Sequence, residues 1–293
     1  MRRLPLIACH LCFVLILCGG ASHAVEPVPL TSTGHAKSGL TFRDAETLAF
    51  AEEISGQQLA LMQLSLSTGE VSRIFPEEKN VQFGLAFSPD RQHMAYIKSV
   101  GNLNLRLVIR QLESGAEAEF GEGGFSGTQN PCFTPDSQRL LYAYPVDGRQ
   151  HIWSCNLKCE DRKRVVDSVG INNWPTCTPD GLLVFGSSRD GNFEIYSQPL
   201  AGGDARRLTY SPFQDIRPRV SPDGSQIAFT SARDGNYDIY VMATDGTDVR
   251  RVTRNPERDD HPAWHPDGRL AYVAEQGGAF EIVLVEVPAG TQP

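Results

Sequence analysis

The sequence lacks the signatures of several common chemistries. It has no Gly-x-Ser-x-Gly segment, which argues against peptidases that carry a serine hydrolase domain. It has no glycine-rich loop ending in Lys-Ser or Lys-Thr, so a phosphate-binding loop is not predicted. Loops with aspartates at alternating positions and a terminal glutamate, the pattern of a calcium site, are also missing. We therefore expect no catalytic site and no cofactor.

Positive charge is scarce as well. The chain has 27 lysines and arginines against 35 aspartates and glutamates, for a net charge of −8 at pH 7. A surface with this excess of negative charge repels nucleic acid and anionic lipid. Neither is an expected partner.

Long apolar runs are missing too. The run from Leu4 to Leu17 is too short to cross a bilayer comfortably, so no membrane span is predicted. Because Arg2 and Arg3 precede it and small residues lead to Ala24, it predicts a cleaved signal peptide over residues 1–24. The remaining chain, residues 25–293, is then periplasmic or secreted. A lipid anchor at Cys18 is the alternative, but the residue before Cys18 is not small.

The sequence does contain a turn that recurs at a nearly fixed interval. A Pro-Asp pair preceded by Ser, Thr or His places its aspartate at Asp90, Asp136, Asp180, Asp223 and Asp267, which are 43 to 46 residues apart. A sixth copy, Phe42-Arg43-Asp44, lacks the proline. This period is the length of one four-stranded propeller blade. Residues 25–293 are therefore predicted to form an all-β, six-bladed β-propeller.

The fifth repeat shows how four antiparallel strands arise. Ser221-Pro222-Asp223-Gly224 is typical of a type I turn, and it joins the innermost strand to the second. Asp234-Gly235-Asn236 closes a second reversal and Asp245-Gly246-Thr247 a third. The last repeat has no outer strand of its own. We expect the segment near Leu30 to supply it and close the ring, which also hides a strand edge.

Four cysteines lie beyond the predicted signal peptide. Cys155 and Cys159 flank a predicted hairpin and are the candidate disulfide, with Cys159 in the place of the turn glycine Gly246. Cys132 and Cys177 lie one step out of phase on neighbouring inner strands. We expect their side chains to point to opposite faces and to remain free thiols.

One face of the propeller is predicted to carry a binding rim. The loops between second and third strands share this face with the loops that enter the innermost strands. Polar groups of both signs with one exposed aromatic suit recognition of a protein or peptide. The rim consists of Asn172, Asn173, Trp174, Arg189, Asp190, Asp215, Arg217, Arg233, Asp234, Asp259, Asp260 and His261. The alternative is a solvated rim of structural turns, with Trp174 packed between blades.

His261 and His265 invite a metal interpretation. On a strand, however, residues four apart lie about 13 Å from each other, so a shared metal site is not predicted. Asp215, Asp259, Asp260 and His261 are the only group from which an enzyme site could be assembled.

The combined motifs resemble the TolB-type propeller repeat, also called the WD40-like Pro-Asp repeat. They are [Ser/Thr]-Pro-Asp-Gly, Arg-Asp-Gly-Asn-x-[Asp/Glu]-Ile-Tyr and Asp-Gly-x-x-x-Arg-Arg-[Leu/Val]-Thr, within residues 28–290. The resemblance implies a periplasmic, non-enzymatic module that docks a protein or cell-envelope partner, for instance a peptidoglycan-associated lipoprotein. TolB itself carries an α/β domain ahead of its propeller, and we expect none here.

Two other functions remain open at this point. The first is a propeller enzyme, a lyase or hydrolase that acts on polysaccharide or peptide at the channel mouth. The second is a protein whose contacts run along the blade sides, near Arg206-Arg207 and Arg250-Arg251.

Overall fold

The computed structural model describes residues 28–56, 58–101, 104–121 and 127–290. The predicted signal peptide lies outside the described residues. Within them the chain forms 23 strands, and no helix there is long and apolar enough to cross a membrane.

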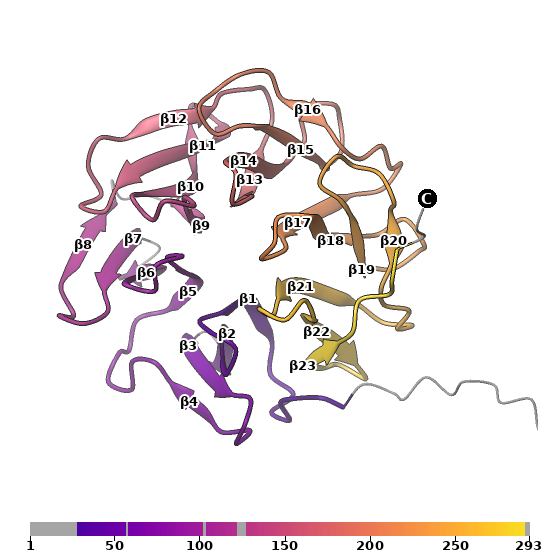
Figure 1. Ribbon diagram of the computed structural model, residues 1–293. Helices are drawn as coiled ribbons and strands as arrows, with labels where there is room; N and C mark the ends of the chain where they lie inside the picture. Colours follow the sequence, from indigo (N-terminus) through magenta and orange to yellow (C-terminus); the bar gives the residue numbers. More distant parts are fainter. Residues whose placement is uncertain (1–27, 57, 102–103, 122–126, 291–293) are drawn as a thin grey trace, which may run out of the picture.

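The strands form six sheets that surround a common axis, one sheet for each sequence repeat (Figure 1). Within each sheet, consecutive strands pair antiparallel from the axis outward. Blades 1 to 3 contain β1 (Lys37–Phe42), β2 (Thr47–Ser55), β3 (Gln58–Ser65), β4 (Val71–Arg73), β5 (Gln82–Phe87), β6 (His93–Val100), β7 (Asn104–Gln111), β8 (Glu117–Phe120), β9 (Gln129–Phe133), β10 (Arg139–Val146), β11 (Arg149–Asn156) and β12 (Lys163–Val166).

Blades 4 to 6 complete the ring. They contain β13 (Asn172–Cys177), β14 (Leu182–Ser187), β15 (Glu194–Pro199), β16 (Arg206–Arg207), β17 (Asp215–Val220), β18 (Gln226–Ser231), β19 (Asp238–Ala243), β20 (Arg250–Arg251), β21 (Asp259–Trp264), β22 (Leu270–Gln276) and β23 (Ala279–Val285). The predicted six-bladed all-β fold is confirmed.

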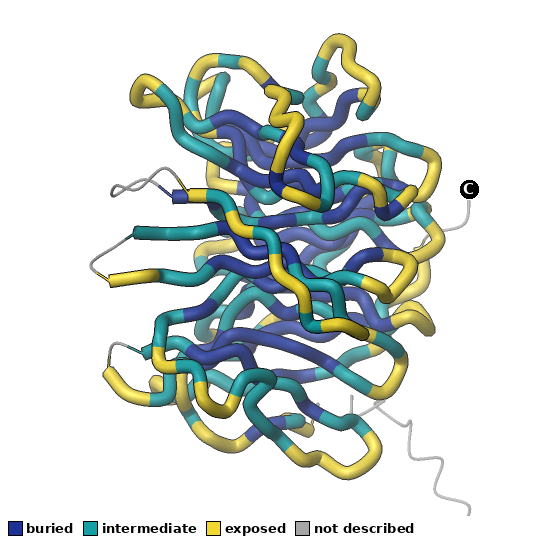
Figure 2. The backbone as a smooth tube through the Cα atoms, turned by 90° about the vertical axis from the view of Figure 1, so that its left-hand side faces the viewer, coloured by how far each residue is buried: buried dark blue, intermediate teal, exposed yellow. Residues whose placement is uncertain are grey.

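The hydrophobic core lies between neighbouring blades. Ile239 and Val241 of blade 5, for example, pack in one cluster with Leu270 and Tyr272 of blade 6. Each blade therefore needs its neighbours to bury its apolar faces, as expected for a repeat architecture. In the side view the buried segments run through the strands, and the exposed residues gather in the turns at both ends of the blades (Figure 2).

The segment before β1 closes the ring against the last blade. Leu30 N donates to Ile282 O at 2.7 Å, and Pro29 forms an antiparallel bridge with Val283. The Thr31 hydroxyl accepts a hydrogen bond from Ile282 N at 2.9 Å. The predicted closure near Leu30 is confirmed, although the segment forms an isolated bridge rather than a full strand.

The Pro-Asp turns use a left-handed residue at their fourth position. Glycine holds it in three of them, at Gly181, Gly224 and Gly268, with φ between 76° and 96°. Arg91 and Ser137 hold it in blades 2 and 3, with φ of 61° and 60°. Because an L side chain is strained there, these two turns are less stable than the glycine versions.

Replacing Arg91 with glycine is expected to raise the free energy of unfolding by about 1 kcal/mol, because the strain is removed at an exposed position. Chemical denaturation measures the change. Gly181→Ala is the matched control: an added Cβ would meet nothing within 4 Å, so φ alone should make this variant less stable. A loss of stability in the Arg91 variant would contradict the prediction.

The four cysteines are all free thiols in the structure. Cys155 and Cys159 are buried free thiols, so the predicted disulfide between them is not formed there, and Cys159 Sγ donates to Ala118 O at 3.6 Å. Cys159 does take the turn position, with φ of 61°.

Cys132 and Cys177 are free thiols, as predicted. Both side chains pack against the cluster between blades 3 and 4, and each thiol perturbs the pKa of the other. Blades stack face to face, so side chains on opposite faces of neighbouring sheets point toward one another.

Candidate functional site

A ring of left-handed residues surrounds the propeller axis. Every innermost strand has one residue with positive φ at the point where its pairing register shifts, which is typical of a β-bulge. These residues are Gly39, Gly84, Asn130, Trp174, Arg217 and His261, with φ between 49° and 64°.

The ring is uneven in composition. Blades 1 and 2 have glycine at this position and blade 3 has asparagine, the residues that accept positive φ most readily. Blades 4, 5 and 6 have Trp174, Arg217 and His261, for which this conformation costs about 1–3 kcal/mol each. Strained backbone of this kind is concentrated at functional sites. The three side chains mark one side of the axis as the candidate site.

Trp174 and Arg217 are in contact across the boundary between blades 4 and 5. The Arg217 guanidinium lies over the Trp174 ring, 5.5 Å from its centroid. The same indole lies 5.1 Å from the Phe193 ring, and it covers Gly186, where an added Cβ would approach the ring to 2.7 Å. Both Trp174 and Arg217 are partly exposed, so the pair presents an aromatic surface and a cation to solvent.

Asp260 anchors the charged groups of the site. Its carboxylate lies 3.1 Å from Arg217 Nη1, pairs with Arg258, and accepts hydrogen bonds from Thr230 Oγ1 at 2.9 Å and from the backbone N–H of His261 at 2.7 Å. Burial opposes ionisation, but the adjacent imidazole and the two guanidinium groups lower the pKa of Asp260 to about 2. Asp260 is therefore an ionised, buried positioning group.

His261 is neutral at pH 7. Burial lowers its pKa to about 4; the charge of Asp260 opposes this shift, and the charges of the three arginines nearby add to it. Its Nδ1 accepts a hydrogen bond from Gly39 N at 3.4 Å, which links blade 6 to blade 1. His265, four residues on, bonds through its Nε2 with Ala45 O at 2.9 Å and occupies a turn. Among the described residues, no three His, Cys, Asp or Glu side chains gather as metal ligands.

The Arg-Asp-Gly-Asn loops are occupied within their own blades. Arg233 stacks on Phe229 and Tyr240, at 5.4 and 4.8 Å from the ring centroids, and pairs with Asp215 at 2.8 Å. Arg189 stacks on the equivalent aromatic pair of blade 4. These two predicted site residues therefore hold turns in place, the structural alternative considered for them.

The aspartates of these loops have similar roles. Asp234 accepts a hydrogen bond from the Tyr240 hydroxyl and lies 3.2 Å from Arg251. Asp190 contacts the corresponding tyrosine and arginine of blade 4. Both are exposed, yet both are already paired.

Five predicted rim residues are buried, which corrects the prediction that they line an exposed surface. Asn172, Asn173, Asp215, Asp259 and Asp260 are at most 7 % exposed. The reason is their position at the start of an innermost strand, where the neighbouring loops cover them. Burial raises the pKa of Asp259 to about 6, but it also removes this carboxylate from any substrate.

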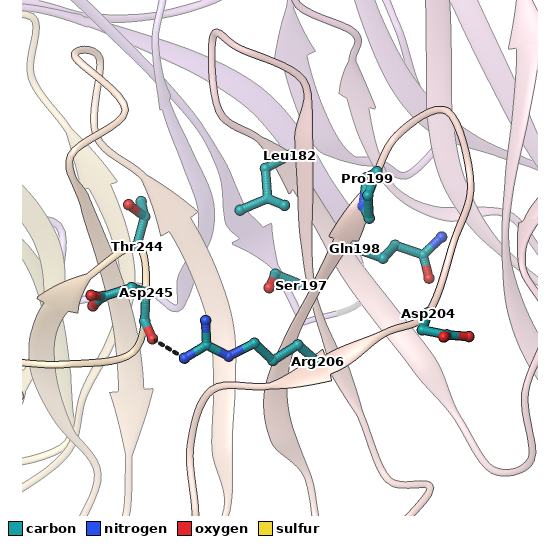
Figure 3. Close-up of a pocket in the computed structure, with 8 residues that line it drawn as sticks. All are labelled: Leu182, Ser197, Gln198, Pro199, Asp204, Arg206, Thr244 and Asp245. Atoms are coloured by element: carbon teal, nitrogen blue, oxygen red, sulfur yellow. Dashed lines mark hydrogen bonds between the residues drawn. The ribbon is translucent and has the colours of Figure 1, made fainter.

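The basic pairs on the blade sides are also engaged. Arg206 lines a shallow pocket between blades 4 and 5 and donates to Asp245 O at 3.0 Å (Figure 3). Arg207 and Arg251 pair with the buried carboxylates of Glu194 and Asp238, at 2.8 and 2.6 Å. These three arginines therefore hold strands and turns in place.

Sequence reasoning named Trp174, Arg217 and His261 but missed what unites them. All three stand five residues before the proline of a Pro-Asp turn, as Asn130 and Gly84 do. That shared position was the available signal. The positive φ of Trp174 and Arg217 was not visible in the sequence, because tryptophan and arginine rarely adopt it.

A closed ring of six antiparallel sheets defines the chain as a six-bladed β-propeller. Residues 47–221 and 211–292 match the model of the TolB beta propeller domain, so the chain belongs to this family. An uncharacterized protein of Agrobacterium fabrum is 33% identical over 96 residues, which are 32% of this chain and 33% of that protein. The chain thus matches about a third of that relative's length.

Solved structures share the fold at lower identity. TolB from Acinetobacter baumannii superposes with a TM-score of 0.69 at 21% identity, over 84% of this chain and 65% of that one. A structure provisionally assigned to TolB, from Agrobacterium tumefaciens, gives 0.69 at 19%, over 88% and 93%. Oligogalacturonate lyase from Vibrio parahaemolyticus gives 0.58 at 14%, over 89% and 93%.

Proposed function

We propose that this chain is an exported, non-enzymatic binding module that docks a protein or another cell-envelope component. The docking face contains Trp174, Arg217 and His261. One observation carries the proposal: three blades place large side chains in a strained conformation where the other three place glycine or asparagine. Folding stability alone favours glycine or asparagine at this position. A binding role for the larger side chains explains why they are present despite the strain.

Other features agree with binding rather than catalysis. Trp and Arg are the residues that most often anchor protein interfaces, and here they are in contact and partly exposed. The carboxylate with the raised pKa, Asp259, is fully buried and accepts a hydrogen bond from Asn255 at 3.1 Å. A rigid ring holds the docking residues in place, so little conformational entropy is lost on binding.

Replacing Trp174 with asparagine tests the proposal. Asparagine occupies the same position in blade 3, as Asn130 with φ of 49°, so the fold should tolerate it. We expect the affinity for a partner isolated with the native chain to fall by roughly thirtyfold or more, the loss typical of an interface anchor. Binding is measured with both purified components, starting with the peptidoglycan-associated lipoprotein of the same cell.

Arg206→Gln on the blade side is the control and should bind normally. Equal affinity of the Trp174 variant and the native chain would overturn docking at this face.

A further inference from the structure

Cationic groups outnumber anionic ones beside the propeller axis. Arg217 and Arg258 share the single carboxylate of Asp260. Arg219, two residues from Arg217 on β17, has no carboxylate within 4.0 Å among the described residues. Its side chain donates one hydrogen bond, from Nη1 to Pro218 O at 3.1 Å. Three guanidinium groups and one carboxylate leave a local excess of positive charge in a chain whose net charge is −8.

Arg217 also has an unused hydrogen-bond donor. Its Nη1 is buried and makes no hydrogen bond, although it lies 3.1 Å from Asp260 Oδ2, because the two groups are close but poorly aligned. A buried donor without a partner costs about 1–3 kcal/mol. The Arg217 side chain as a whole is 21 % exposed, so a ligand can still reach part of it.

The positive charge persists near neutral pH. Burial lowers the pKa of Arg219, and the charge of Arg217 lowers it further, but arginine stays protonated in proteins. The imidazole of His261 is neutral and adds no charge. The cluster can therefore attract an anion without itself being titrated.

We propose that Arg217 and Arg219 bind a carboxylate on an acidic peptide segment of the docked partner. This inference rests on the proposed function. The planar guanidinium fork matches a carboxylate and donates two parallel hydrogen bonds to it. Trp174, stacked under Arg217, supplies an apolar surface beside the carboxylate for the rest of the peptide. The carboxylate belongs to an Asp or Glu side chain or to a free C-terminus.

Titration calorimetry with a short Asp- and Glu-containing peptide tests the site without the natural partner. We expect Arg219→Gln to weaken binding roughly ten- to a hundredfold, the loss typical of a charge-assisted hydrogen bond. Arg254→Gln removes the same charge from an exposed residue in the loop between β20 and β21 and is the matched control. Equal binding by the native chain and the Arg219 variant would overturn the proposal.

Peptide variants identify the source of the carboxylate. Loss of binding on C-terminal amidation indicates a terminal carboxylate, and loss on changing Asp and Glu to Asn and Gln indicates side chains; either supports the proposal. Displacement of the peptide by inorganic phosphate but not by acetate would overturn the assignment to a carboxylate.

The carboxylate site and the docking face can fail separately. Suppose that a partner requires Trp174 but binds the native chain and Arg219→Gln with equal affinity. Docking at this face is then supported and the carboxylate site is contradicted. Suppose instead that the peptide requires Arg219 but Trp174→Asn does not lower the affinity for any partner. The carboxylate site is then supported and docking at this face is contradicted.

Discussion

Lys37→Met is expected to lower the free energy of unfolding by about 3–5 kcal/mol, the usual loss when a buried ion pair loses one partner. The Lys37 side chain is fully buried, and its ammonium lies 3.4 Å from Glu52 and 3.2 Å from Glu281. Without it, two carboxylates remain close together with little solvent. Glu281 also accepts hydrogen bonds from Thr31 and Gly34, so the variant weakens the segment that closes the ring.

The pH dependence gives this prediction a second test. Burial opposes ionisation of Glu281, but hydrogen bonds from Thr31 and Gly34 and the charge of Lys37 outweigh it and lower its pKa. A carboxyl group whose pKa is lower in the folded than in the unfolded protein stabilises the fold at pH values above its unfolded-state pKa. This stabilisation is lost as the pH falls through its folded-state pKa. In Lys37→Met the carboxylate of Glu281 gains a proton more easily, so the loss of stability relative to the native chain should shrink in acid.

Chemical denaturation of matched variants measures the loss. Lys98→Met removes the same charge from a partly exposed pair, 3.5 Å from Glu78 and 3.9 Å from Glu119, and should cost less than about 1 kcal/mol. Lys37→Met combined with Glu52→Gln should recover part of the stability. If Lys37→Met were no more damaging than Lys98→Met, the closing network would be of minor importance.

Asp260→Ala is expected to cost about 3 kcal/mol of folding free energy and to abolish binding at the docking face. The carboxylate joins blade 6 to Thr230 of blade 5, accepts from the backbone N–H of His261 and neutralises Arg217 and Arg258. Its removal leaves two groups without this partner: the buried hydroxyl of Thr230 and the guanidinium of Arg217, which is less exposed than that of Arg258. Asp260→Asn keeps an acceptor for Thr230 and His261, so its loss should be clearly smaller.

The contrast with Arg217→Asn separates folding from function. Asparagine suits the left-handed conformation, and Asp260 would keep Arg258 as its partner. We expect this variant to unfold at nearly the native denaturant concentration while losing partner affinity. A native-like Asp260→Ala, or an unfolded Arg217→Asn, would contradict the roles assigned to the two residues.

Sequence reasoning located the blades well because each turn carries local information. Proline presets φ and aspartate and glycine tolerate the turn, so Ser221-Pro222-Asp223-Gly224 identifies a reversal wherever the rest of the chain lies. Closure near Leu30 followed from counting strands in the last repeat. The proposed docking face was harder to predict: Trp174 and Arg217 were expected in the rim and are partly exposed, whereas Asp215 and Asp259 were expected to be exposed and are buried.

The amino-acid sequence by itself determined the repeat length, the number of blades, the four-stranded pattern and the family, because these depend on residues close together along the chain. Only the tertiary structure decided which polar side chains reach solvent, that Cys132 and Cys177 pack against the same cluster, and that Arg219 has no carboxylate within 4.0 Å among the described residues. Each of these features depends on how one blade packs against the next. With a repeat of this length, the residues that meet between blades are about 40 or more positions apart in the sequence.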